Sequence, residues 1–162
     1  MKKASAILAI TALVLFSDLA GYDSTENISG VIIFESGETL EFHNFLYFNA
    51  RFRENPPTNE AIPVKYDDGI KLIPFTQLKS FKVIEFKIVS VTKESGPPTK
   101  IWTGTAEIET TDGNKVTCTY DSLGRVDVEI WDEETKSTKT QSIFVLDFKN
   151  KKLNIKEIQF NN

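Results

Sequence analysis

The stretch KVTCTYDSLGRVDVEIW, residues 115–131, indicates most directly how this chain folds. Apolar and polar side chains alternate on both sides of a turn that we expect at 121–124. Alternation with a period of two is typical of a β-strand that buries one face and exposes the other. The stretch therefore predicts two consecutive strands. Their core-facing residues are expected to be Val116, Cys118, Tyr120, Val126, Val128 and Ile130.

The strongest hairpin signal is Asp67-Asp68-Gly69, which lies between the apolar segments 61–66 and 70–73. Residues of these types tolerate positive φ, so they suit the tight turn that joins two antiparallel strands. Pro74 lacks a backbone donor and is expected to end the second strand.

Residues 38–48 are interpreted as one strand that turns Leu40, Phe42, Leu46 and Phe48 to the core. Phe45 and Tyr47 then lie on the opposite face. Further strands are expected over 81–91, 100–110, 142–148 and 153–160. The sequence therefore predicts a single all-β domain over 22–162, an antiparallel β-sandwich or barrel of about ten strands.

Two halves of this domain, 28–92 and 100–162, echo each other. The pattern that starts at Gly37 recurs 76 positions later at Gly113, and residues 73–78 align with 153–158 at a separation of 80. Gly96-Pro97-Pro98 is the expected boundary between the halves. These matches suggest an internal repeat that forms two pseudo-symmetric β-units.

The N-terminus has the pattern of a secretory signal peptide. Lys2 and Lys3 precede an apolar run of 13 residues, 4–16, which is too short for a bilayer that needs about 20 residues. We expect a signal peptide over 1–21 and an extracytoplasmic location for the mature protein, in a periplasm, at a cell surface or in the medium. A buried N-terminal helix is the alternative.

Leu19-Ala20-Gly21 resembles the run that precedes the lipidated cysteine of bacterial lipoproteins, but Tyr22 stands at the cysteine position. A phenol cannot form the thioether, so no stable membrane anchor is expected after cleavage. Cys118 is the only cysteine in the chain. The fold is therefore expected to depend on its core, without a disulfide.

Composition disfavours nucleic acid as a partner. The formal net charge is −4, and basic residues form no stripe, whereas phosphate binding requires clustered Lys and Arg. The sequence indicates no oligomeric state.

Catalytic patterns are also missing from the sequence. The single histidine, His43, is not accompanied by a nucleophile motif. We find no cysteine and histidine set typical of zinc, no EF-hand spacing and no phosphate-binding glycine loop. No catalytic residue, metal or cofactor is expected.

Binding is predicted at Trp131, which shares a strand face with Asp127 and Glu129. An aromatic ring beside acids suits a sugar ring or a protein partner. Phe45 and Tyr47 are further candidates. In the alternative interpretations a loop covers Trp131, and the strand over 38–48 is buried on both faces.

The leading hypothesis is an exported, non-catalytic β-domain that binds a protein or glycan partner or has a structural interaction role. One alternative is a β-barrel that carries a small apolar ligand. The other is a glycoside hydrolase that uses Asp127 and Glu129, since such enzymes need two carboxyl groups about 5–10 Å apart.

Overall fold

The computed structural model describes residues 27–53, 58–91, 95–96, 99–147 and 149–162. The expected signal peptide, 1–21, lies outside these residues. The described chain is built of strands and two short 3-10 helices, η1 (Phe75–Gln77) and η2 (Lys151–Leu153), and none of its helices could cross a bilayer. The strands are β1 (Gly30–Phe34), β2 (Thr39–Phe42), β3 (Asn44–Arg51), β4 (Ala61–Tyr66), β5 (Gly69–Pro74), β6 (Leu78–Val91), β7 (Thr99–Thr110), β8 (Lys115–Tyr120), β9 (Ser122–Asp132), β10 (Ser137–Phe144) and β11 (Ile155–Phe160). The predicted all-β class is confirmed.

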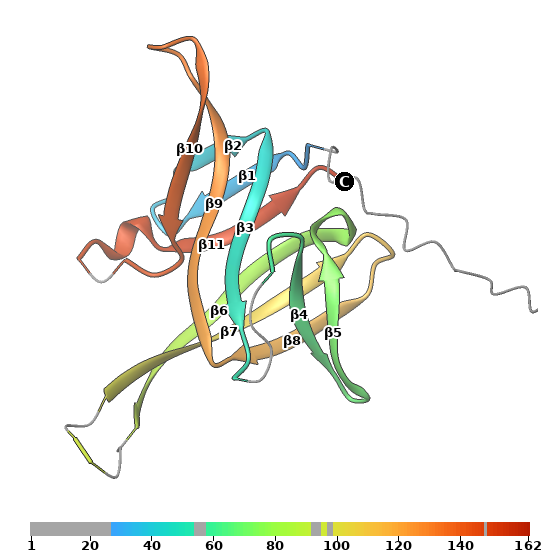
Figure 1. Cartoon of the computed structure of the whole chain (residues 1–162), viewed down its shortest axis with the longest axis vertical. Helices are drawn as coiled ribbons and strands as arrows, with labels where there is room; N and C mark the ends of the chain where they lie inside the picture. The colour runs from blue at the N-terminus through green and yellow to red at the C-terminus, as the bar shows by residue number, and fades with distance from the viewer. Residues whose placement is uncertain (1–26, 54–57, 92–94, 97–98, 148) are drawn as a thin grey trace, which may run out of the picture.

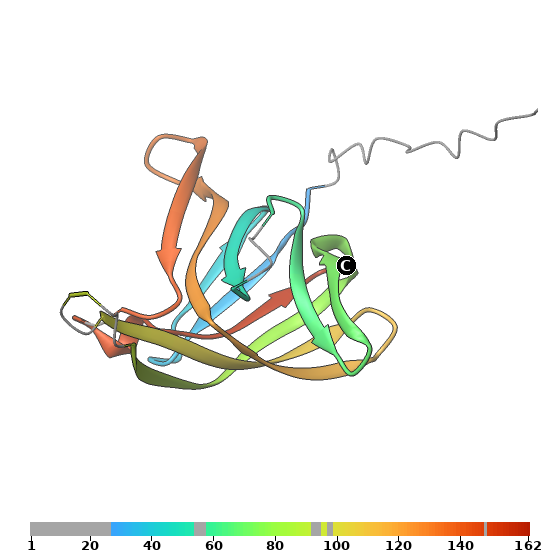
Figure 2. The same ribbon diagram turned by 60° about the horizontal axis from the view of Figure 1, so that its bottom comes forward.

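The strands form three antiparallel sheets. The largest has six strands in the order β2-β1-β11-β6-β7-β8, the second has the order β10-β9-β3, and the third is the β4-β5 hairpin. Figure 1 shows β10, β9, β3 and the hairpin in front of the six-stranded sheet, and Figure 2 shows the same two layers from another side.

The core fills the space between the layers and is rich in aromatic rings. Phe48 of β3 and Phe81 of β6 are both fully buried, and their ring centroids lie 4.7 Å apart in an edge-to-face arrangement. Phe45 and Phe75 pack in the same way at 4.9 Å. Aromatic pairs at this spacing add about 0.5–1.5 kcal/mol each beyond the area that they bury.

The β4-β5 hairpin is fastened to the end of the six-stranded sheet. The predicted turn at Asp67-Asp68-Gly69 is confirmed, because β4 pairs with β5 from Ala61↔Pro74 to Tyr66↔Gly69. The buried Tyr120 hydroxyl of β8 donates a hydrogen bond of 2.9 Å to the Pro63 carbonyl of β4. This contact closes the layers on the side of β8.

Two strand pairs that are 76 positions apart in the chain have the same register. Gly30↔Phe42 and Ile32↔Leu40 join β1 to β2, and β7 joins β8 through Ala106↔Cys118 and Ile108↔Val116, each residue 76 positions later. The order of the six-stranded sheet is symmetric about its centre. β2 and β8 are its edge strands, β1 and β7 lie next to them, and β11 and β6 are the two central strands.

The turn between β1 and β2 and the turn between β7 and β8 also have the same backbone geometry. Gly37 and Gly113 both have φ +86°, and each donates its N–H at 2.9 Å to the carbonyl three residues earlier. The helices η1 and η2 are likewise 76 positions apart. The alignment of 73–78 with 153–158 at a separation of 80 differs from this spacing by four residues.

The single strand predicted over 38–48 is wrong. The chain bends at His43, so β2 ends at Phe42 and β3 begins at Asn44. The pairing of β3 with β9 also shifts register between Phe45 and Tyr47. A bulge of this kind changes which residues face the core, and Phe45 is consequently buried rather than exposed.

Two boundaries in the second half also differ from the prediction. The strand expected over 142–148 runs from Ser137 to Phe144, and Gly124 lies within β9 rather than in a turn. The last strand, β11, leaves β10 and pairs between β1 and β6 in the other sheet.

Candidate binding surface

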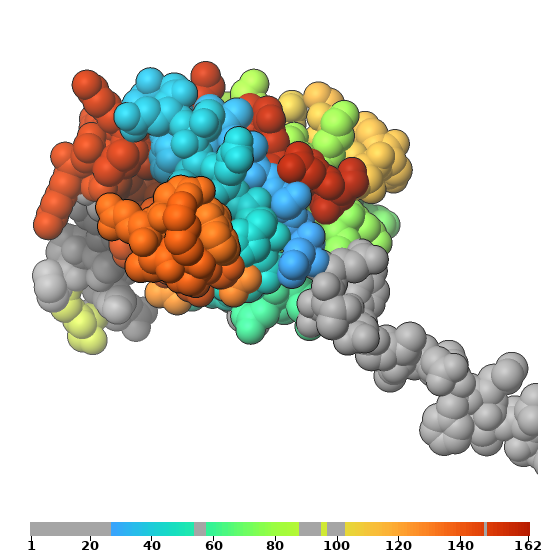
Figure 3. Space-filling view, turned by 90° about the horizontal axis from the view of Figure 1, so that it is seen from above, coloured from blue at the N-terminus to red at the C-terminus, as the bar shows by residue number. Residues whose placement is uncertain are grey.

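The outer face is the side of the β10-β9-β3 sheet that points away from the six-stranded sheet. Strand register defines it, because directly paired residues of antiparallel strands share a face. It comprises Asn44 and Tyr47 of β3, Arg125, Asp127, Glu129 and Trp131 of β9, and Thr138, Thr140, Ser142 and Phe144 of β10. In the space-filling view of Figure 3, the orange end of the β9–β10 hairpin stands out from the body beside the cyan segment of β2 and β3.

Trp131 lies near the free end of this face and is 52% exposed. The alternative that a loop buries it is therefore not what the structure shows. Its partner in the ladder is Thr138, whose hydroxyl lies 3.3 Å from Nε2 of His43. The ring thus stands beside polar groups and leaves about half of its surface open.

Asp127 and Glu129 are held in fixed positions by neighbouring donors. The Ser142 hydroxyl donates to Oδ1 of Asp127 at 2.6 Å, and Nε of Arg125 lies 3.2 Å from the same oxygen. Asn44 donates from Nδ2 to Oε2 of Glu129 at 2.9 Å. Because Asp127 and Glu129 are two positions apart in the same strand, their Cα atoms are separated by about 7 Å.

Tyr47 and Phe45, the other two candidates, lie on opposite faces of the sheet. The Arg125 guanidinium lies 5.9 Å from the centroid of the half-buried Tyr47 ring, a cation–π contact across β3 and β9. Phe45 is 3% exposed and packs on Phe75 in the core. Phe45 is therefore removed from the predicted binding residues, because the bulge in β3 turns it inward.

Sequence reasoning missed the residues that complete the outer face, above all Arg125, Ser142 and the 64% exposed Phe144. Arg125 alternates with Asp127 and Glu129, so its face could have been inferred from period two. Ser142 and Phe144 could be placed only with the register of β10 on β9, and the predicted strand began at the wrong residue.

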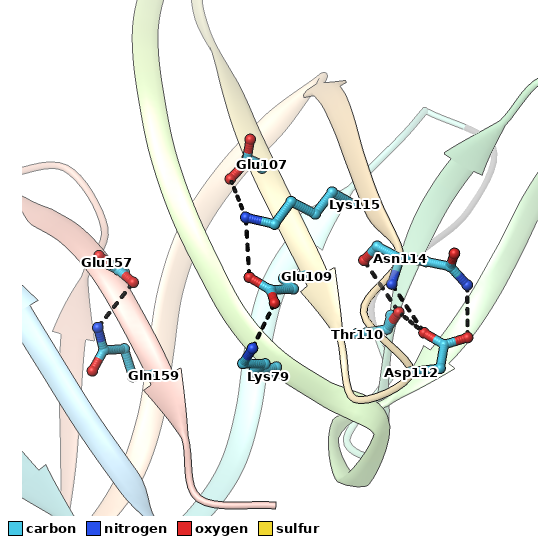
Figure 4. A network of polar contacts seen from close by, with 9 residues as sticks. All are labelled: Lys79, Glu107, Glu109, Thr110, Asp112, Asn114, Lys115, Glu157 and Gln159. Carbon is cyan, nitrogen blue, oxygen red and sulfur yellow. Dashed lines mark hydrogen bonds and ion pairs between the residues drawn. The ribbon is translucent and has the colours of Figure 1, made fainter.

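The exposed face of the six-stranded sheet has a different character. There Glu109 accepts from Lys79 at 2.7 Å and pairs with Lys115 at 3.3 Å, and Glu107 lies 3.8 Å from the same Lys115 (Figure 4). These ion pairs lower the pKa of Glu109, first through Lys79. The charges of this cluster, Lys79, Glu107, Glu109 and Lys115, are thus satisfied by one another.

The chemistry that the outer face offers is an open aromatic ring and a set of oriented hydrogen-bonding groups. Among the described residues, no group of His, Cys, Asp and Glu is arranged to hold a metal ion. Burial raises the pKa of the Cys118 thiol, which lies in the core. Comparisons of the chain with models of protein families, with curated proteins and with solved structures returned no match.

Proposed function

We propose that this chain is an exported, non-catalytic binding domain whose outer face contacts its partner. The observation that carries the proposal is Trp131, a large aromatic side chain that is 52% exposed on the same strand face as Asp127 and Glu129. Exposed aromatic rings among ordered polar groups are typical of recognition surfaces.

Export is supported by residues 1–21, where two lysines precede a short apolar run. The absence of cysteine at position 22 supports release without a lipid anchor. An extracytoplasmic binding domain also has no need of the catalytic groups that the sequence lacks.

We further propose that the scaffold is a β-sandwich that arose by internal duplication of a unit such as 28–92. Support comes from the equal register of β1–β2 and β7–β8 and from the matching turns at Gly37 and Gly113. Two such units packed through a shared core form a rigid platform under the outer face.

The two alternatives receive less support. A carrier needs an empty interior, whereas the buried hydrophobic residues of the described chain, Ala61 excepted, form one cluster that includes rings of both layers. For a glycoside hydrolase, one carboxyl group must be free to donate a proton. Asp127 is instead engaged by Arg125 and Ser142, an arrangement that suits an ordered binding group.

The test compares Trp131→Ala with a matched control, Leu72→Ala. Leu72 of β5 is 51% exposed and lies outside the outer face, so both variants remove an exposed apolar side chain. The two variants and the wild type are passed over glycan arrays and used to capture proteins from the exported fraction of the source cells. We expect retained partners to be lost only with Trp131→Ala. Equal retention by all three, or turnover of a substrate that Glu129→Gln abolishes, contradicts the proposal.

A further inference from the structure

We infer that the partner of the outer face is an extended glycan without acidic groups, which lies along β9 and β10. This inference rests on the proposed binding function and adds the chemical class of the ligand. It depends on how aromatic, polar and charged side chains are distributed over the face.

Aromatic rings mark both ends of the outer face. Trp131 is opposite Thr138 near the hairpin, and Phe144 is opposite Arg125 six residues away along β9. At about 3.4 Å per residue, this separation is about 20 Å. Both rings are exposed by more than half, Trp131 by 52% and Phe144 by 64%. A ligand that contacts both must be long and extended.

Between the rings, the paired strands present only polar side chains. Thr140 is opposite Glu129 and Ser142 is opposite Asp127. Sugar hydroxyls can both donate and accept hydrogen bonds, so they match a surface that mixes hydroxyl groups with carboxylates. The apolar face of a sugar ring can meanwhile stack on an aromatic side chain, which combines a large contact area with a polar rim.

The same distribution disfavours a folded protein as the partner. The centre of a protein–protein interface is generally depleted of charged residues, and polar groups occupy its rim. On the outer face the order is reversed, since the carboxylates of Asp127 and Glu129 lie between the two exposed rings, which mark the ends.

Charge indicates which glycans fit. The charged residues of the outer face are Arg125 against Asp127 and Glu129, so its formal charge is 1 − 2 = −1. Arg125 is already paired with Asp127. Uronate, sulfate or phosphate groups would therefore be repelled, whereas hydroxyl or amino groups would be accepted.

The experiment measures binding of purified protein to oligosaccharides of several residues. The probes are neutral glucan, mannan, xylan and chitin fragments, deacetylated chitin fragments and polygalacturonate fragments. Binding by every protein is followed by calorimetry; for the proteins that retain Trp131 it is also followed by Trp fluorescence in a Trp102→Phe background, so that the emission comes from Trp131. The variants are Trp131→Ala and Phe144→Ala, with Leu72→Ala as the control.

We expect at least one neutral or amine-bearing probe to bind, with no binding of polygalacturonate. Each aromatic variant should weaken binding about tenfold, the usual effect of losing an aromatic anchor, and Leu72→Ala should leave it unchanged. Circular dichroism of each variant confirms that the fold is retained.

The outcomes separate the ligand class from the binding function. A captured protein that depends on Trp131, without binding of any oligosaccharide, overturns the glycan inference and leaves the binding function standing. Preferential binding of polygalacturonate also overturns the inference. If neither oligosaccharides nor proteins bind in a manner that depends on Trp131, both the inference and the proposed function are wrong.

Discussion

Replacing Tyr120 by Phe should remove one hydrogen bond between the β4-β5 hairpin and β8 without disturbing the shape of the core. Tyr120 is fully buried, and its ring stacks on Phe52 at 4.8 Å. The substitution keeps the ring and removes only the hydroxyl group that donates to the Pro63 carbonyl at 2.9 Å. The Pro63 carbonyl then loses the donor that joins it to β8.

The expected cost at pH 7 is about 1–3 kcal/mol of unfolding free energy, the range for a buried polar group that loses its partner. This loss is much smaller than the 3–5 kcal/mol that truncation of a buried aromatic residue to Ala costs. The variant should therefore fold, with a lower urea midpoint and an unchanged denaturant slope, because the surface exposed on unfolding remains the same.

Alkaline pH supplies a second signature of the same group. Burial raises the pKa of Tyr120 well above its ordinary value of 10.0, so above that pH the unfolded chain releases a proton that the folded chain retains. The folded state therefore loses stability as pH rises. One such group contributes a loss of about 1.4 kcal/mol by one pH unit above its unfolded pKa. Tyr120→Phe lacks this contribution. The difference in unfolding free energy between the variant and the wild type should therefore become smaller between about pH 10 and 11.

Urea unfolding followed by circular dichroism at pH 7, 10 and 11 measures both effects. Tyr47→Phe is the matched control, because Tyr47 is a half-buried tyrosine of the outer face; its unfolding free energy should stay within about 0.5 kcal/mol of the wild type at pH 7. A Tyr120→Phe variant as stable as this control at pH 7, with an unchanged gap at pH 11, would refute the reasoning.

Three further predictions follow from backbone and core geometry. Gly30→Ala should lower the free energy of unfolding by about 3 kcal/mol or prevent folding. The added Cβ would lie 2.1 Å from the Gln159 carbonyl oxygen and 2.5 Å from Cζ of Phe42. Thermal unfolding measures this loss of stability. Gly113→Ala meets no atom within 4 Å but must adopt φ +86°, so a smaller cost of about 1–2 kcal/mol is expected in the same assay. Cys118 is 3% exposed, and burial raises the pKa of its thiol, so maleimide should label it in urea but not in the folded protein; rapid labelling without denaturant would contradict the placement of β8 in the core.

Sequence patterning was most informative where apolar and polar residues alternate without interruption. In β8 and β9, the predicted core residues Cys118, Tyr120, Val126, Val128 and Ile130 are all buried, and Val116 is partly buried against the core. Each of these strands buries one face and exposes the other, so period two describes them fully. The exposed face of β9, and with it the positions of Trp131, Asp127 and Glu129, followed from the same pattern.

Patterning failed in β3 because almost every residue of Asn44–Arg51 can be placed on either face. Phe45, Leu46, Tyr47 and Phe48 are consecutive and aromatic or apolar. The bulge opposite Val128 and Asp127 decides which of them point inward. That choice depends on contacts with a strand about 80 residues away in the chain, which local sequence does not encode.

The start of β10 was missed because this strand has too few apolar residues, whereas β3 has too many. Only Ile143 in Ser137–Phe144 is buried, so hydrophobic periodicity has almost nothing to detect. The strand exists because its backbone pairs with β9 along its whole length, from Ser137↔Asp132 to Phe144↔Arg125. The contribution of Thr138, Thr140 and Ser142 to the outer face was therefore hidden from the sequence.

The location of the outer face follows from a difference between the proposed duplicate halves. β3 and β9 occupy equivalent places, yet β3 has 8 residues and β9 has 11. The pairing of β9 with β3 ends at Asn44↔Glu129, while its pairing with β10 continues to Asp132. Trp131 therefore lies beyond the end of β3, where the hairpin projects above the body (Figure 1).

In the first half, the strand after β3 takes another course. β4 pairs with β5 and is tied to β8 through Tyr120, so it covers the core instead of lengthening the front sheet. β4 thus helps to close the layers, whereas β9 and β10 extend as a two-stranded ribbon beyond the end of β3. Because this ribbon extends beyond the body, we propose recognition on β9 and β10 rather than on β4 and β5.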